Sequence, residues 1–155
     1  MYAGLGVTIG SVSSPSVYFN GYTNTGFFAP GADQFGISCA GSLILQASAT
    51  DVTVNGTVTA TDFNSTSDIN LKKDISEIEN PLDLVEKLHG VKFTWKSDDR
   101  KTIGVIAQEL EEVLPELVSN TDIKTVNYDG LIGVLIEAVK ELKAEIEELK
   151  TKLNN

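Results

Sequence analysis

Short runs of β-branched and aromatic residues, separated by glycine-rich turns, dominate the first 66 residues. The runs lie at residues 6–9, 16–19, 36–48 and 51–63. Runs of this kind predict strands, and Asn20-Gly21 and Asn55-Gly56 predict turns, the second within a hairpin or a β-arch. No long helix is expected before residue 80. The first part of the chain is therefore predicted to be all-β.

From residue 80 the apolar spacing changes to that of a short helix. Asn80 is suited to be the N-cap, Pro81 stands at the first helical position, and Gly90 is the predicted terminator. The apolar face of this helix is formed by Leu82, Leu84, Val85 and Leu88.

A hairpin and a second short helix follow. VKFTWK, residues 91–96, alternates apolar and polar positions, which predicts a strand that buries Val91, Phe93 and Trp95. DDR, residues 98–100, is the predicted turn, and KTIGVIAQ, residues 101–108, contains the predicted second strand of the hairpin. AQELEEVLPELV predicts a short helix broken at Pro115, because proline cannot continue a helix.

The last segment carries a heptad pattern at about residues 130–153. Alternating spacings of four and three residues define a seam made of Leu135, Val139, Leu142, Ile146, Leu149 and Leu153. Such a seam is typical of a coiled coil that associates with other copies, although a helix packed on its own domain is the alternative. The seam does not by itself select a trimer, since its residues would also suit two strands.

Charge divides the chain into two segments, residues 1–66 and 67–155. The first has three charged residues (Asp33, Asp51 and Asp62), whereas the second has all twelve basic residues and nineteen of the twenty-two acidic ones. An all-β segment with so little charge exposes strand edges unless copies of it intertwine. The fold class is therefore predicted to be mixed α+β: an intertwined trimeric β-stalk or tip, then a small α+β domain that ends in a coiled-coil helix.

Net charge and cysteine content narrow the function. A formal charge of -10 argues against nucleic acid or an anionic membrane as a partner. No secretory signal or apolar span of membrane length is found, and the strand-like sequence at the start suggests a piece of a longer protein. Cys39 is the single cysteine, and we expect it to be a buried small residue.

The segment STSDINLKKD, residues 65–74, offers the candidate chemistry. A serine attacks an amide only if a base takes its proton. His89, the lone histidine, is expected at a helix end, where a cation suits the helix dipole. A Ser-Lys dyad is the remaining route, and Ser67 and Lys72 lie five residues apart. Serines and lysines at this spacing are common by chance, so the pattern alone is weak.

Four motifs follow one another within residues 67–155, before the terminal heptads: SDINLKKDI, GVKFTWK, IGVIAQELEEVLPELV and VNYDGLIGVLIEAVKEL. Together they resemble the C-terminal intramolecular chaperone domain of phage tail spikes and tail fibres, the peptidase S74 family. The stretch at residues 20–42 is similar, more loosely, to the glycine-rich β-segments that precede this domain in tail fibres.

The resemblance implies site residues at matching positions. Ser67 matches the nucleophile and Lys72 the general base, with Thr66-Ser67 as the scissile bond; Lys73 competes for the base role, but its spacing fits less well. Asp68 and Leu71 match the same motif as positioning residues. Gly104, Gln108 and Pro115 match a central motif, for which we expect a packing role. The mechanism requires no metal or other cofactor.

The resemblance also implies a function. Such a domain acts as a chaperone that brings three chains together and lets the upstream β-stalk fold. It is also a serine endopeptidase that cuts its own chain, in cis and only once, and is released by that cut. The protein would be made in the host cytoplasm, with its N-terminal part kept in the virion and no insertion into a membrane. A solvated lysine, with a pKa of about 10.4, is a poor base at neutral pH, so we expect trimer packing to bury Lys72 and switch cleavage on.

Two other readings stay open. The first is a non-cleaving, trimeric fibre tip that binds a host-cell surface receptor. Its contacts would come from Tyr18, Phe19, Tyr22, Phe27 and Phe28, for most of which interior packing is the alternative. The second is a Ser-Lys hydrolase that acts on other proteins, for which the sequence offers no substrate cleft.

Overall fold

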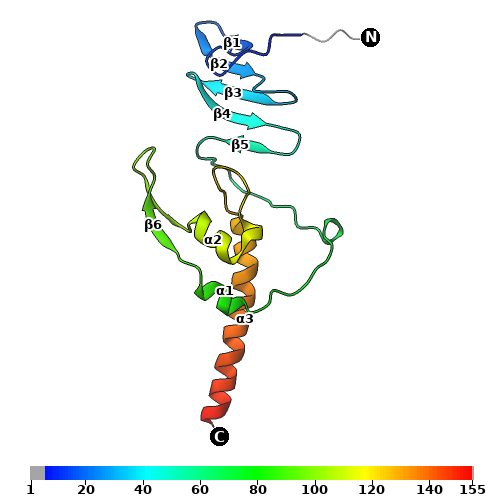
Figure 1. Cartoon of the computed structure of the whole chain (residues 1–155), viewed down its shortest axis with the longest axis vertical. Helices are drawn as coiled ribbons and strands as arrows, with labels where there is room; N and C mark the ends of the chain where they lie inside the picture. The colour runs from blue at the N-terminus through cyan, green and yellow to red at the C-terminus, as the bar shows by residue number, and fades with distance from the viewer. Residues whose placement is uncertain (1–5, 155) are drawn as a thin grey trace. The chain divides into compact units, whose positions relative to one another are not determined.

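The computed structural model describes residues 6–154, which form two compact units (Figure 1). The first unit ends at Ser67 and the second begins at Asp68, one residue after the boundary predicted from charge. The ends of the predicted segments, at residues 1–5 and 155, lie outside the described residues. The fold is mixed α+β, as the sequence predicts, with antiparallel sheets and a long C-terminal helix.

The described part of the first unit contains one five-stranded antiparallel sheet. Each strand pairs with its neighbour in sequence, in the order β1-β2-β3-β4-β5. The strands are β1 Val17–Phe19, β2 Tyr22–Phe28, β3 Phe35–Cys39, β4 Ser42–Ala47 and β5 Val52–Val54. The predicted turn at Asn20-Gly21 joins β1 to β2, and Gly21 has the positive φ of +87° that favours glycine. The sheet is thus a meander built from local pairings.

One face of this sheet carries an apolar row whose residues range from half-buried to exposed. The register aligns one residue from each strand across the sheet: Val17, Phe27, Ile37, Leu45 and Val54. Side chains directly opposite one another share a face. Both Val17 and Phe27 at one end of this row are exposed. The row leaves apolar surface that self-association could bury.

Two predictions in the second half of this sheet are wrong. No hairpin forms at Asn55-Gly56, because Asn55 binds back to β4: its backbone N–H donates to Ile44 O and its side chain to Leu43 O. The described residues from 56 to 68 contain no strand. Cys39 is exposed rather than buried, since it ends β3 at the turn into β4.

Residues 6–9, predicted as a strand, are not one. Their contact with the sheet includes a single backbone hydrogen bond that Ile9 O accepts from Ala29, and one such bond does not make a ladder. The longest strand, β2, falls in the glycine-rich stretch that the β-propensity runs did not include.

The second unit is built around one long helix, α3 Tyr128–Leu153, against which α1 and η2 pack (Figure 1). The shorter elements, in chain order, are η1 Ile69–Leu71, α1 Pro81–Glu86, β6 Val91–Thr94, β7 Lys101–Gly104, α2 Ala107–Val113 and η2 Pro115–Leu117. The two 3₁₀ turns (η1, η2) are single turns. The core centres on Leu110, Leu114 and Val134. Of the apolar face predicted for α1, Leu84, Val85 and Leu88 pack partly buried around this core, and Leu82 is not part of the cluster.

Helix α1 starts where predicted, but its cap differs. Asn80 is at the N-cap position with φ +48°, in the left-handed region, and its side chain makes no capping hydrogen bond. Glu141 of α3 supplies the acceptor instead, for the backbone N–H of Leu82. The helix end is therefore stabilised by a tertiary contact.

The hairpin also forms, with Val91 and Phe93 half-buried in β6. Trp95 is 47% exposed, which contradicts the predicted burial. Its backbone N–H already bonds Arg100 O across the turn, so Trp95 lies beyond the strand, with its ring edge-on to Phe93.

Helix α3 has two apolar faces. Leu131, Val134 and Ala138 lie toward α1 and the core. The six residues of the predicted heptad seam all lie outside that face and are 43–84% exposed. Helix α3 thus packs on its own unit and still leaves the seam open; pairing of the seam with other copies stays a prediction.

Candidate functional site

The candidate site lies in an exposed stretch, residues 64–77, that holds Ser67 and Lys72. Within it, η1 forms because Asp68 caps the turn: its carboxylate accepts hydrogen bonds from the backbone N–H of Asn70 at 2.8 Å and from the Asn70 side chain at 2.9 Å. An aspartate acceptor satisfies N–H groups that a turn leaves without a partner. Asp68, predicted as a positioning residue, fixes the local backbone.

Lys72 ends the same turn. Its backbone N–H donates to Ile69 O at 3.1 Å, and its φ of −115° and ψ of 149° return the chain to an extended conformation. Ser67 directly precedes the cap residue, so one 3₁₀ turn separates the predicted nucleophile from the predicted base. Both residues take part in polar interactions in this structure. The side chain of Leu71 is exposed and packs on no core here.

The central motif contributes packing through its glycine. A Cβ at Gly104 would lie 2.8 Å from Tyr128 Oη and 3.3 Å from Phe93 Cε1, so a larger residue would require these two side chains to shift. Pro115 is the first residue of η2, and Leu114 alone separates it from the end of α2. Gln108 is exposed on α2, and the expected packing role does not apply to it.

His89 lies outside the candidate site. Its Nδ1 is 3.4 Å from a carboxylate oxygen of Glu109, with both side chains largely exposed. This arrangement agrees with a surface contact near the end of α1. Across the described residues, no group of three or more His, Cys, Asp or Glu side chains could hold a metal ion.

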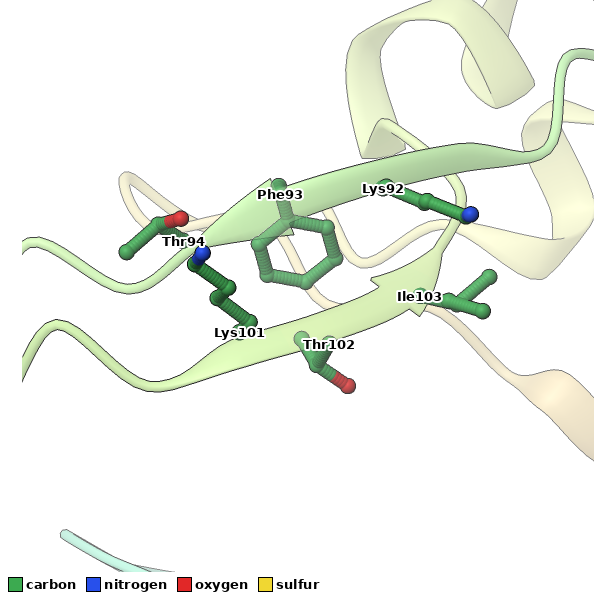
Figure 2. A pocket seen from close by; sticks show the side chains of 6 residues that line it. All are labelled: Lys92, Phe93, Thr94, Lys101, Thr102 and Ile103. Carbon is green, nitrogen blue, oxygen red and sulfur yellow. The ribbon is translucent and has the colours of Figure 1, made fainter.

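Two hollows lie in the second unit. Figure 2 shows the first, of about 290 Å³, on the hairpin: Lys92 and Ile103 lie at one end, Thr94 and Lys101 at the other, with the ring of Phe93 between. The second, of about 410 Å³, lies between the chain before α1, the end of α2 and α3. Sequence reasoning predicted neither, because each depends on tertiary packing.

Residues 67–119 match the family model Peptidase_S74, described as chaperone of endosialidase. Within the second unit, this segment is similar to the family. The match begins at Ser67 and extends through the hairpin, α2 and η2 to Ser119. The predicted resemblance of the charged part of the chain to the chaperone family is thereby confirmed.

Curated relatives of the chain are named long tail fiber protein Gp37. The chain is 42% identical over 98 residues to the protein of Enterobacteria phage K3, an alignment that covers 56% of this chain and 8% of the relative. The protein of Enterobacteria phage T2 gives the same identity and covers 7% of that relative. The protein of Salmonella phage S16 is 34% identical over 111 residues, an alignment that covers 63% of this chain and 15% of that relative.

The chain therefore spans no more than 15% of the length of any of these three relatives. Among the residues described, no helix has the length and apolar character needed to cross a membrane.

Proposed function

We propose that this chain is part of a phage tail fibre in which the chaperone-of-endosialidase segment assembles the fibre and then cuts itself away. The family match, which begins at Ser67, is the observation that carries the proposal. The division into two compact units at Ser67 supports it, since a cut there would separate them. The relatives named as long tail fiber proteins support the structural context.

The assembly step uses the seam on α3. Six exposed apolar residues at heptad spacing suit a homotrimeric coiled coil that brings three chains into register. The first unit, with its partly exposed apolar row, would then fold against equivalent sheets of its partners. Pairing between chains is slow because distant segments must meet, which is why a template helps.

The chemical step uses Ser67 and Lys72. The neutral amine of Lys72 takes the hydroxyl proton, and Ser67 Oγ attacks the carbonyl carbon of Thr66. The Thr66-Ser67 amide bond breaks, its nitrogen receives the proton from Lys72, and an ester joins Thr66 to Oγ. Water then hydrolyses this ester to a Thr66 carboxylate and a free Ser67 hydroxyl. Burial of Lys72 on assembly favours the neutral amine and couples the cut to trimer formation.

Cleavage would make the product kinetically stable. Once the template has left, intertwined strands that separate have no easy way to reassemble, so their lifetime is set by an unfolding rate. The first unit would remain in the virion and the second would be released in the host cytoplasm, where the chain is made.

Intact mass and denaturing electrophoresis of freshly expressed protein test this function. We expect fragments that meet at Thr66-Ser67 in the parent chain and only the full-length mass in Ser67→Ala and Lys72→Ala. Lys96→Ala, on the exposed hairpin turn, is the matched control and should still be cut. A full-length mass in every variant would remove the peptidase and leave the assembly role alone.

A trimeric receptor-binding tip without cleavage is the second candidate. The aromatic residues Tyr18, Phe19 and Tyr22 lie exposed around the β1–β2 turn, where they could contact a cell surface. Phe28 is buried and cannot take part. Alanine substitution of the three exposed residues should abolish adsorption to host cells while trimer formation persists, if this reading is right.

A further inference from the structure

The segment that holds the candidate base leaves three large apolar side chains in water. Ile69, Leu71 and Ile75 are 69%, 75% and 65% exposed. They flank two lysines, Lys72 and Lys73, in a stretch of seven residues that we term the exposed 69–75 segment. Exposed apolar side chains that cluster within a short segment are typical of an interaction site.

The larger hollow of the second unit has matching properties. This α2–α3 groove, of about 410 Å³, has an apolar floor that includes Val113, Leu117 and Val134. Its volume falls within the range of roughly 300–1,000 Å³ that is usual for binding pockets. Gly130 helps to shape it, because a Cβ there would collide with Leu117.

Three carboxylates line the same groove: Glu77, Glu79 and Glu116. In the part of the chain that the structure describes, none of them forms an ion pair. Lys73 forms none either within those residues. An apolar floor with an acidic border is complementary to the three aliphatic side chains and two adjacent lysines of INLKKDI, whose single carboxylate, Asp74, leaves the segment with a net positive charge.

The segment is not a regular strand. Lys72 is extended, whereas Leu71 is the last residue of η1 and Asp74 has a positive φ of 52°. Docking requires Leu71 and Lys73 to face the groove and Lys72 to face away from it. With Leu71 on the apolar floor, Lys73 would meet the carboxylates. Lys72 would lie away from them, which matters because a carboxylate neighbour would favour the charged amine.

We propose that the α2–α3 groove of one copy binds the exposed 69–75 segment of a second copy of this chain. Residues 76–79, which directly follow the segment, line the groove of the same chain. Leu71 nevertheless stays exposed in the single chain. We therefore take a second copy as the occupant. The proposal rests on the proposed function and deepens it: a neighbouring subunit would supply the surroundings of Lys72. Cleavage then requires an adjacent chain.

Crosslinking between two chains of different tag length tests this docking. All chains carry Ser67→Ala, which keeps them intact whether or not Ser67 cuts, and Cys39→Ser, which removes the exposed native thiol. One chain carries Leu71→Cys and its partner Glu116→Cys, at an exposed position on the groove. After co-expression and treatment with a short bismaleimide, we expect a covalent dimer of mixed tag length.

Controls separate docking from chance contact. Lys96→Cys, on the exposed hairpin turn, replaces Glu116→Cys and should give little mixed dimer. Equal yields of mixed dimer with Glu116→Cys and Lys96→Cys would overturn the proposal. A further sample places Leu71→Cys and Glu116→Cys in the same chain. Crosslinking found only within that chain would show that the segment occupies its own groove, and it would also overturn the proposal. Val113→Cys gives a second position on the floor, and absence of mixed dimer with both groove positions also refutes docking. Because the crosslinked chains carry Ser67→Ala, this experiment reports docking alone. Absence of peptidase activity would appear only in the mass experiment, so failure of the docking proposal and failure of the proposed function can be told apart.

Discussion

The carboxylate of Glu141 on α3 accepts a hydrogen bond from the backbone N–H of Leu82 in the first turn of α1, at 3.1 Å. Asn80 adopts a left-handed conformation and leaves this capping role open. A residue 59 positions away in sequence thus completes the helix end. The start of α1, soon after the exposed 69–75 segment, is held by the same helix that carries the heptad seam.

Removal of this contact should weaken the second unit. Glu141→Ala leaves the Leu82 N–H without its acceptor, and loss of a helix cap costs about 1 kcal/mol. We expect a lower free energy of unfolding in urea, with partial recovery in Glu141→Gln, which keeps an acceptor oxygen. Glu145→Ala, on an exposed position of α3, is the control. Equal stability of Glu141→Ala and the parent would show that water replaces the carboxylate.

Charge on the seam should prevent assembly without unfolding the chain. Ile146 is exposed and lies beyond the part of α3 that packs on the core. Ile146→Lys would place a cation in the centre of a coiled coil, which strongly disfavours association. Light scattering should report a trimer for the parent and a monomer for this variant. Lys143→Ala should stay trimeric; a monomeric parent would refute assembly through the seam.

The contact between β1 and β2 should be intolerant of any side chain at Gly26. A Cβ there would lie 2.0 Å from Val17 O, a backbone atom that cannot move without breaking the strand pair. We expect Gly26→Ala to cost about 2 kcal/mol or more. Thermal unfolding, followed in the first unit, measures the loss. Gly6→Ala, where a Cβ meets nothing within 4 Å, should be neutral.

The cap of η1 should affect the rate of the proposed cleavage more than stability. Asp68→Ala removes the acceptor of two hydrogen bonds from Asn70 and lets the turn between Ser67 and Lys72 open. A cap is worth about 1 kcal/mol, so cleavage should slow roughly fivefold. Electrophoresis over time measures it, with Asp62→Ala as control. Asp68→Asn keeps an acceptor and should restore most of the rate.

Local signals explain why much of the second unit was predictable. Pro81 at a helix start, the proline after α2 and the repeated spacing on α3 each act within a few residues of chain, so the sequence displays them directly. The candidate residues Ser67 and Lys72 came from a motif, and the family match begins at the first of them.

Contacts between distant residues explain the rest. Glu141 takes the capping role expected of Asn80, and Leu117 packs over Gly130. Both contacts join residues that are distant in sequence, so they exist only in the folded chain. Asn55-Gly56 has a hairpin composition, but a bond back to Leu43 decides its structure. The groove that faces solvent between α2 and α3 arises from four separate stretches, none of which indicates it alone.

The part of α3 beyond Glu141 is exposed on every side as far as it is described. Its helical conformation receives no support from its own unit, and an isolated helix of that length is marginal in water. The chain therefore contains an optical reporter of its own association. The far-ultraviolet ellipticity at 222 nm should deepen on concentration as these turns gain partners, so a dilution series can follow assembly without any label.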